Sequence, residues 1–248
     1  MANSVTLSGV TLDYALYSVR AQSLRNAVLN MAVGGRLMAG QNDITVVRAL
    51  SGVSFKLEDG DRLGLVGHNG SGKTSLLKVL AGIYEPTAGV VDIKGRISSM
   101  IAMGAGLDPD ASGLQNIKNL AMMQLVPRRE IDRRLPEIVE FSELGAFINM
   151  PFKTYSSGMM ARLMFSVITS VSADILIMDE WVSAGDAEFQ QKARERLSNI
   201  VDNAKIVIIA SHDMHTIRRV CNKVMVMDSG RPSFFGPADE WAQMNGLV

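Results

Sequence analysis

Gly67-His68-Asn69-Gly70-Ser71-Gly72-Lys73-Thr74 decides the fold, because this stretch matches the phosphate-binding pattern G-x-x-x-x-G-K-[ST] at every fixed position. Its glycines let successive backbone N–H groups converge on phosphate oxygens. Lys73 adds a positive charge, and the hydroxyl of Thr74 is a ligand for Mg²⁺. The stretch therefore predicts a site for the phosphates of a nucleotide.

The flanking residues have the patterns that such a loop needs. Asp61 to Val66 has the pattern of a strand that enters the loop, and Ser75 to Ala81 that of the first turns of a helix. The N-terminus of a helix favours an anion. A chance glycine-rich turn is the alternative, and the order of strand, loop and helix argues against it.

The whole chain has 248 residues, enough for one or two domains, and its 25 basic and 25 acidic residues cancel. This balance does not favour a nucleic-acid partner, although a local basic patch is compatible with it. Cys221 is the one cysteine, which excludes an internal disulfide, fits a reducing cytosol, and is interpreted as a small buried apolar residue. Neither a secretory signal nor an apolar run of about 20 residues is found.

The pattern along the chain predicts an α/β protein. Val5 to Tyr14 alternates like a strand, Ser18 to Met38 has helical spacing with a stop at Gly34-Gly35, and Val46 to Leu57 returns to strand character. After the phosphate loop, strands are expected at 90–93, 96–101, 175–178, 206–210 and 224–227, and helices at 187–201 and 214–220. Continuous apolar runs indicate buried parallel strands, so we expect a three-layer α/β core.

The middle of the chain differs from both ends. Residues 112–150 have a helical pattern with dense charges at 128–134, punctuated by Pro109, Pro127 and Pro136. We therefore expect one domain over 1–248. Its core is predicted at 1–102 and 172–248, with a helical subdomain at about 110–171 and an inserted helix or loop at about 18–45.

Two carboxylates follow an apolar strand at Ile175 to Met178. Such a strand delivers side chains to the carboxyl edge of the sheet, where ligands of α/β folds bind. Asp179 is placed to hold Mg²⁺, directly or through water, and Glu180 to orient and deprotonate an attacking water. The alternative is a solvated acidic pair at an ordinary strand end.

A second anion site is predicted at Tyr155-Ser156-Ser157-Gly158-Met159, which opens a helix over Met159 to Val171. Ser156 and the backbone around Gly158 are able to approach a phosphate at that N-terminus. Because the chain already has its own phosphate loop, a second anion site implies a second chain. The pentapeptide alone is a weak signal, since Ser-Ser-Gly is common in turns.

Over essentially its whole length, the sequence resembles the nucleotide-binding subunit of an ABC transporter. Its motifs follow the family's order and spacing: Walker A at 67–74, a divergent signature at 155–159, Walker B at 175–180, the D-loop at Ser183-Ala184-Gly185-Asp186 and the switch at Ser211-His212-Asp213. The resemblance implies the ABC ATPase fold, a P-loop NTPase core with a mixed sheet, an antiparallel β-subdomain and an inserted helical subdomain. It also implies ATP hydrolysis with Mg²⁺, coupled to transport.

The resemblance further implies a head-to-tail homodimer in which each ATP lies between one phosphate loop and the partner's signature. Catalytic roles fall to Glu180, His212 at the γ-phosphate, and Lys73; Mg²⁺ falls to Thr74 and Asp179. The implied ATP-binding residues are Tyr14, Gly67, His68, Asn69, Gly70, Ser71, Gly72, Lys73, Thr74, Ser75, Ser156, Ser157, Gly158 and Asp186.

Three of these assignments have open alternatives. A structural histidine after a buried strand would equally explain His212, and a helix N-cap before Ala187 would explain Asp186. Tyr14 stands where the family places an aromatic that stacks on adenine, with core packing as the rival role and Tyr17 as the other candidate.

One position departs from the family pattern. A Gln usually links the core to the helical subdomain, helps to bind Mg²⁺ and senses the membrane partner. Counting back from Pro109 and Asn116, that position is Met103, which does not ligate Mg²⁺. Asp108 or a water molecule is the candidate to take the place of that Gln at Mg²⁺.

The variant motifs resemble those of polysaccharide exporters. The first two are the linker Gly104-Ala105-Gly106-Leu107-Asp108-Pro109 and the segment after it, which has Ser112-Gly113 and Asn116-Ile117. The other two are the signature at 155–159 and the segment at 179–186. That group moves lipid-linked O antigen, capsule or teichoic acid, and residues 13–17 and 23–25 look like its O-antigen and teichoic acid type. We expect export of O antigen, with teichoic acid, capsule or another substrate as alternatives; a small-molecule P-loop kinase or a non-transport ATPase is disfavoured by the motif set.

The expected partners are therefore a permease dimer and a lipid-linked polysaccharide, at the cytoplasmic face of the inner membrane. The insertion at 18–45 carries Arg20, Arg25 and Arg36, with Arg48 just beyond it, against Asp43 alone. A basic amphipathic helix is able to lie near anionic headgroups, while a solvated face packed on the domain is the alternative. Since little follows the core, we expect no recognition of a capped sugar terminus by this polypeptide.

Overall fold

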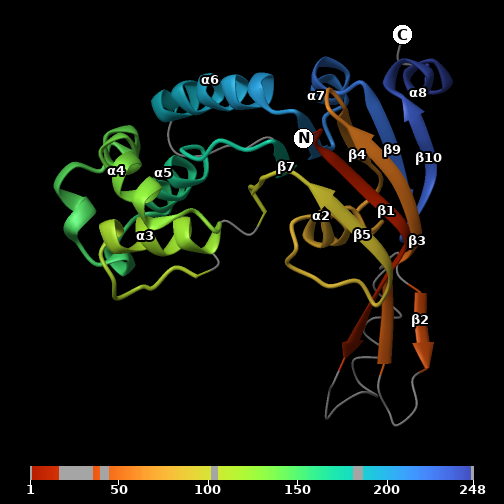
Figure 1. Ribbon diagram of the computed structural model, residues 1–248, viewed down its shortest axis with the longest axis horizontal. Helices are drawn as coiled ribbons and strands as arrows, with labels where there is room; N and C mark the ends of the chain where they lie inside the picture. The colour runs from red at the N-terminus through yellow and green to blue at the C-terminus, as the bar shows by residue number, and fades with distance from the viewer. Residues whose placement is uncertain (1, 17–35, 40–44, 102–105, 181–186, 247–248) are drawn as a thin grey trace. The chain divides into compact units, whose positions relative to one another are not determined.

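The computed structural model describes residues 2–16, 36–39, 45–101, 106–180 and 187–246. By its contacts the chain divides into two compact units (Figure 1). Unit 1 comprises Met1–Ile97, Ile177–Trp181 and Lys205–Val248, and unit 2 comprises Ser98–Leu176 and Val182–Ala204. Among the described residues, no helix combines the length and apolarity needed to cross a membrane.

An antiparallel sheet forms one part of unit 1. Within the described residues its strands lie in the order β2 (Arg36–Ala39), β3 (Thr45–Glu58), β1 (Ser4–Leu16) and β5 (Ala88–Lys94). The predicted strands at 5–14, 46–57 and 90–93 are thus confirmed. The helix predicted over 18–38 is wrong at its end, because residues 36–38 pair with β3 as an antiparallel strand. The rest of that segment lies outside the described residues.

The second sheet is mixed, which confirms the predicted α/β fold. Its strands lie in the order β10 (Arg231–Pro237), β9 (Lys223–Asp228), β4 (Arg62–Val66), β8 (Ile206–Ala210), β7 (Ile175–Asp179) and β6 (Ile97–Ser99). Strand β4 is parallel to both β8 and β9, whereas β10 is antiparallel to β9. Every residue of β8 is buried, as the apolar run predicts for a central parallel strand.

Three helices lie in the described part of unit 1. They are α2 (Lys73–Leu80), α7 (Met214–Val220) and α8 (Ala238–Met244). A Cβ on Gly64 would lie 2.9 Å from Ile217 of α7 and 3.2 Å from Cys221, so this face of β4 packs directly against α7. Cys221 is buried, which raises the pKa of its thiol to about 12. Strand β10 and helix α8 were not expected from the sequence.

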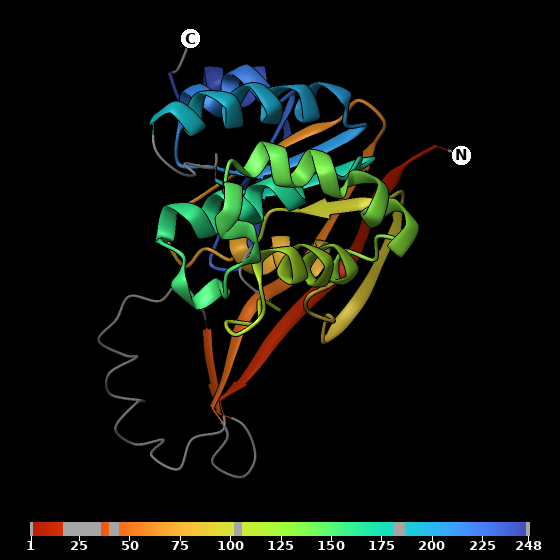
Figure 2. The ribbon, with the colours of Figure 1, turned by 90° about the vertical axis from the view of Figure 1, so that its left-hand side faces the viewer.

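Unit 2 is the helical part of the chain. It contains α3 (Gly113–Met123), α4 (Arg128–Ser142), α5 (Ser157–Ile168) and α6 (Ala187–Asn203), with 3₁₀ turns at Gly145–Asn149 and Phe152–Thr154. Helices α3, α4 and α5 pack side by side in both views (Figures 1 and 2). Pro136 does not interrupt the helical pattern, because it lies inside α4, where buried Ile131 and Ile138 hold the helix in the core.

A glycine at the start of α3 fits against a buried tyrosine. A Cβ on Gly113 would lie 2.1 Å from the Tyr155 hydroxyl, which donates a 2.7 Å hydrogen bond to the Phe147 carbonyl. Backbone atoms also crowd the position, since the Ile148 carbonyl oxygen lies 3.1 Å from the same point. The glycine therefore serves the packing of unit 2.

We expect Gly113→Ala to destabilise the protein by about 1–3 kcal/mol, because the added methyl group overpacks the Tyr155 site. Urea denaturation followed by circular dichroism measures this difference. An unchanged denaturation midpoint would show that the contact between Gly113 and Tyr155 does not constrain the fold.

Candidate functional site

The phosphate loop joins the end of β4 to the start of α2, as its sequence predicts. Gly67 has φ 149° and Gly72 has φ 105°, a backbone region that disfavours side chains. Space excludes side chains too: a Cβ on Gly67 would lie 2.3 Å from the Met227 carbonyl oxygen, and one on Gly72 would lie 2.8 Å from that of Ala49. The two glycines thus let the loop pass close to neighbouring backbone.

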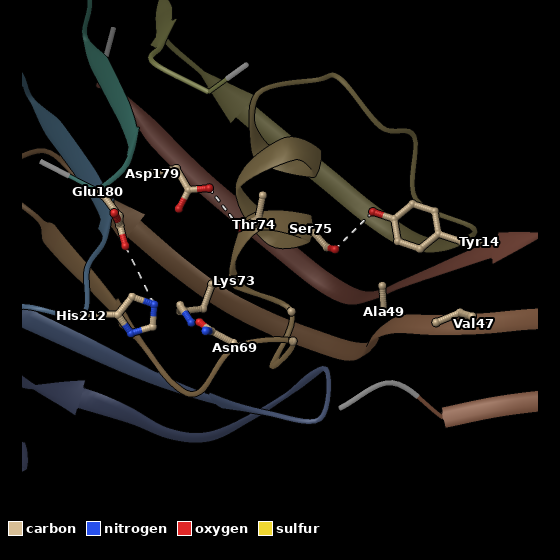
Figure 3. A pocket seen from close by; sticks show the side chains of 12 residues that line it. Tyr14, Val47, Ala49, Asn69, Lys73, Thr74, Ser75, Asp179, Glu180 and His212 are labelled. Atoms are coloured by element: carbon tan, nitrogen blue, oxygen red, sulfur yellow. Dashed lines mark hydrogen bonds and ion pairs between the residues drawn. The ribbon is translucent and has the colours of Figure 1, made fainter. Parts of the chain in front are cut away.

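A cleft of about 590 Å³ opens beside this loop, a size that suits a nucleotide (Figure 3). All of its lining residues belong to unit 1. They are Tyr14, Val47, Ala49, Asn69, Gly70, Gly72, Lys73, Thr74, Ser75, Asp179, Glu180 and His212. Ten of the twelve were expected from the sequence; Val47 and Ala49 of β3 were not.

Lys73 is only 8% exposed, and its ammonium group donates to the carbonyls of Gly67 and His68 at 2.7 and 3.0 Å. Burial lowers the pKa of Lys73, while the negative charges of Asp179 and Glu180 oppose that shift. A phosphate oxygen is a stronger partner than a neutral carbonyl for this ammonium group. Lys73 is therefore poised to exchange its backbone partners for a phosphate.

The predicted Mg²⁺ ligands lie together at the carboxyl edge of the sheet. The Thr74 hydroxyl donates a 2.9 Å hydrogen bond to the Asp179 carboxylate (Figure 3). One hydroxyl and one carboxylate fit Mg²⁺, which takes few protein oxygens and completes its shell with water and nucleotide phosphate. The residues present thus suit the ion that the sequence led us to expect.

Glu180 has an unusual backbone conformation that the sequence does not reveal. Its φ of 71° lies in the left-handed region, and its N–H donates a 2.8 Å hydrogen bond to the Ala210 carbonyl at the end of β8. Left-handed backbone at a residue other than glycine costs energy and is often found at functional sites. The bond to Ala210 holds the carboxylate of Glu180 beside the neighbouring strand end.

His212 comes from that same end of β8, and its Nε2 lies 3.9 Å from the nearer Glu180 carboxylate oxygen (Figure 3). This separation exceeds a hydrogen bond, and both side chains are largely exposed. The two groups flank the open side of the cleft and leave space for a ligand or a water between them.

Tyr14 lines the other end of the cleft. It pairs with Val47 across the antiparallel ladder, and the neighbouring pair is Asp13 with Arg48. Arg48 forms two 2.8 Å hydrogen bonds to Asp13, and they hold the pKa of that carboxyl below its usual value. The charged pair therefore helps to fix the register that presents Tyr14 and Val47 to the cleft.

The other predicted residues of the loop do not line the cleft. Ser71 is buried, and its carbonyl accepts a 2.9 Å hydrogen bond from Gly230 in the turn after β9. His68 turns toward Asp228, the last residue of β9, with 3.2 Å between its Nε2 and the carboxylate. The sequence did not point to Asp228, which lies 160 residues away along the chain.

The predicted second anion site lies in unit 2. Ser156 caps α5 by accepting a 3.2 Å hydrogen bond from the Met159 N–H, so the helix begins as expected. Ser156 and Gly158 line a separate pocket of about 310 Å³, whereas Ser157 does not. Arg162 lies in the wall of this pocket and donates a 3.1 Å hydrogen bond to Glu143.

Several expectations fall on residues outside the described ranges. These are Asp186 with the D-loop, Met103 in the linker, Tyr17 as the alternative to Tyr14, and Arg20 and Arg25 in the insertion. Asp108, the suggested replacement for the missing Gln, is exposed, and its N–H donates to the Asn116 side chain at 2.8 Å.

The profile of the ABC transporter family matches residues 50–183, which is more than half of the chain. The chain belongs to the ABC transporter family. As a member it binds ATP and is an ATPase, in agreement with the phosphate loop and the carboxylates that face it. The resemblance found in the sequence is thus confirmed at the level of the family.

Curated relatives of this ABC transporter protein include ATP-binding subunits of export systems. The O-antigen export system ATP-binding protein RfbE of Yersinia enterocolitica is 40% identical over 92% of this chain and 95% of its own length. RfbB of Klebsiella pneumoniae, with the same description, is 35% identical over 95% and 94%. The teichoic acids export ATP-binding protein TagH of Staphylococcus haemolyticus is 34% identical over 97% and 87%.

Solved structures confirm the ABC ATPase fold. The post-hydrolysis dimer of the ATP-binding cassette MJ0796 bound to ADP and Pi aligns with a TM-score of 0.66, covering 94% of this chain and 98% of that one. An ATP-binding subunit of another ABC transporter aligns at 0.69, covering 98% and 93%. Both are 19% identical in sequence, so the likeness concerns the fold alone.

The pairing of His68 with Asp228 predicts a measurable pH dependence in this ABC transporter ATPase. A hydrogen bond with the Asn69 carbonyl, and then the Asp228 carboxylate, raise the pKa of His68. The same pairing lowers the pKa of Asp228. Any stability from protonated His68 is present below about pH 6.5 and is lost as the pH rises through the raised value. Any stability from ionised Asp228 is lost as the pH falls through its lowered value.

We expect proton NMR of the His68 ring to give a pKa above 6.5, and Asp228→Asn to lower it. The chain has only three histidines, so the His68 signal is assignable. A His68 pKa that Asp228→Asn leaves unchanged would contradict the pairing.

Proposed function

We propose that this ABC transporter ATPase powers the export of a lipid-linked polysaccharide, with O antigen as its substrate. The observation that carries the proposal is the 40% identity to an O-antigen export ATP-binding protein over 95% of that protein's length. The linker at 104–109 and the signature at 155–159 support the same subfamily. TagH, at 34% identity, makes teichoic acid the second candidate.

In the proposed complex, different residues of the cleft in unit 1 bind the phosphates, the Mg²⁺ and the adenine of ATP. Lys73 leaves the carbonyls of Gly67 and His68 and binds phosphate oxygens, and the loop's backbone N–H groups bind the others. Thr74 and Asp179 hold Mg²⁺, which offsets the phosphates' negative charge. Tyr14 offers a flat face on which the adenine stacks.

Glu180 acts as the general base in this proposal. Its carboxylate accepts a proton from the attacking water, and His212 contacts the γ-phosphate from the end of β8. The 3.9 Å between the two side chains places both at the same side of the cleft. The left-handed backbone of Glu180 supports this role, because that conformation and the bond to Ala210 place the residue beside the neighbouring strand end.

The second part of the ATP site comes from another copy of the chain. Ser156, Ser157 and Gly158 at the N-terminus of α5 face the nucleotide of the partner, where a helix N-terminus favours its phosphates. Asp186 orders the contact between the two copies. The core and helical subdomain expected from the sequence correspond in this proposal to units 1 and 2.

Gly158 supports the involvement of a second chain. Among the described residues, a Cβ placed at Gly158 would approach only the Ser156 hydroxyl, at 3.8 Å. Its backbone is helical, a conformation in which alanine is more favourable than glycine by up to about 1 kcal/mol. The described fold thus gives no reason for a glycine, whereas a phosphate that approaches the backbone closely gives one.

The remaining partners follow from the proposed substrate. Two permease subunits carry the polysaccharide across the inner membrane, and the ATPase dimer binds them from the cytoplasmic side. ATP closes the dimer, and hydrolysis with product release reopens it. The closed state must bind ATP more tightly than the open state, since a ligand shifts an equilibrium only through such a difference.

The proposed function is tested in cells that make a surface polysaccharide through this export system and whose own copy of the gene is deleted. We expect lipid-linked polysaccharide to accumulate inside, wild-type protein to restore surface polysaccharide, and Glu180→Gln not to restore it.

Purified Glu180→Gln should bind ATP yet lose ATP hydrolysis by about 100-fold or more, because the general base is gone. Chemical analysis of the accumulated lipid separates O antigen from teichoic acid, and normal surface polysaccharide in the deletion strain would contradict export.

The variant Gly158→Ala distinguishes a role of this glycine in stability from a role in the composite ATP site. We expect its thermal midpoint to stay the same or rise slightly, while ATP hydrolysis falls by about tenfold or more, equivalent to about 1.4 kcal/mol. Gly113→Ala changes a glycine of unit 2 that is crowded by Tyr155, and it is the matched control because it lowers the midpoint instead. Full activity in Gly158→Ala would contradict a phosphate beside α5.

A further inference from the structure

We propose that Ser75 and Tyr84 are positioning residues that fix the ring of Tyr14 at the nucleobase end of the cleft. The inference rests on the proposed role of Tyr14 as the stacking surface for adenine. Contacts from these two residues restrain the orientation of this half-buried strand residue, and Ser75 thereby has a role other than direct contact with phosphate.

The first tie runs from Tyr14 to the helix that carries the phosphate loop. The Tyr14 hydroxyl donates a 3.1 Å hydrogen bond to the Ser75 hydroxyl (Figure 3). Ser75 lies in the first turn of α2, directly after Thr74 and Lys73. The nucleobase end and the phosphate end of the cleft are therefore joined by one side-chain bond.

The second tie is an aromatic contact from the segment after α2. The ring of Tyr84 packs edge-on against that of Tyr14, with 5.5 Å between the centroids and 75° between the planes. Such an arrangement is favourable, because the positive edge of one ring meets the negative face of another. It restrains the plane of Tyr14 as well as its position.

Tyr84 is itself held in place by α2. The Lys78 ammonium group lies 5.3 Å from the centroid of the Tyr84 ring, within the range of a cation–π contact. The N–H groups of Ile83 and Tyr84 both donate to the Lys78 carbonyl, at 2.9 and 3.3 Å. Both ties to Tyr14 thus originate from α2 and the turn that follows it.

A ring fixed before the ligand arrives loses little freedom when a base stacks on it, so pre-organisation increases affinity. The gain applies equally to bound ATP and to the transition state. Removing either tie should therefore raise KM and leave kcat close to its original value. A loss of about three- to tenfold in affinity is expected for each tie, by comparison with measured aromatic pairs and hydrogen bonds.

The alternative is that Ser75 binds a phosphate directly, and a base-free probe separates the two roles. The KM for ATP as substrate and the inhibition constant of inorganic tripolyphosphate as a competitive inhibitor are measured for three variants. The variants are Tyr14→Phe, Ser75→Ala and the double variant. Tyr14→Phe keeps the stacking ring and removes only the hydrogen bond. The expected result is the same rise in the KM for ATP in all three variants, with no change in the inhibition constant of tripolyphosphate.

Two results would overturn the role of Ser75: a larger KM in Ser75→Ala than in Tyr14→Phe, or weaker inhibition of Ser75→Ala by tripolyphosphate. For the second tie, Tyr84→Leu should raise the KM for ATP, and Tyr84→Phe, which keeps the ring, should restore it. Equal KM values for Tyr84→Leu and Tyr84→Phe would overturn the role of Tyr84.

Tyr14→Ala distinguishes this inference from the proposal beneath it. An unchanged KM in Tyr14→Ala means that Tyr14 does not bind the base, and the proposed function of that residue fails. A raised KM in Tyr14→Ala together with wild-type values in Tyr14→Phe, Ser75→Ala and Tyr84→Leu means that Tyr14 stacks on the base without the two positioning residues.

Discussion

The convergence of three strand ends at one edge of the mixed sheet is the constraint on which the cleft depends. Strand β4 is parallel to β8 and leads into the phosphate loop, β8 lies next to β7, and β7 ends at Asp179. Parallel strands bring their carboxyl ends to the same edge. The hydrogen bond from Thr74 to Asp179 and the bond from Glu180 to the Ala210 carbonyl both cross between these ends. Groups more than 100 residues apart along the chain thereby meet at one cleft.

Much of this arrangement could be predicted from the sequence, because it follows from local patterns. The glycines and Lys73 predict the phosphate loop, and the apolar run before Asp179 indicates a buried strand. The contributions to the cleft and its loop from segments far away in the sequence could not be predicted in the same way. Val47 and Ala49 reach the cleft only because β3 pairs with β1 in a register that includes two shifted positions near Tyr14. Asp228 meets His68 only because the end of β9 and the turn that follows it lie beside the phosphate loop.

Unit 2 shows a different limit of sequence reasoning. Its helices follow their apolar periodicity, and the buried residues of α4 keep Pro136 inside the helix. The N-terminus of α5 forms as predicted, with Ser156 as its cap. The reason for Gly158 is absent from both the local sequence and the surrounding side chains, since the described fold leaves space there for a methyl group. Gly113 differs in this respect, because its neighbour Tyr155 occupies that space.

We propose that each ATP site uses the phosphate loop of one copy and the α5 N-terminus of another. Mixing two inactive variants tests it most directly. Lys73→Ala disables the phosphate loop, and Gly158→Asp places a negative charge at the N-terminus of α5; each alone should lack ATPase activity. In a mixed dimer one site carries both changes and the other carries none, so we expect activity to return on mixing. ATP hydrolysis that stays absent in verified mixed dimers would contradict it.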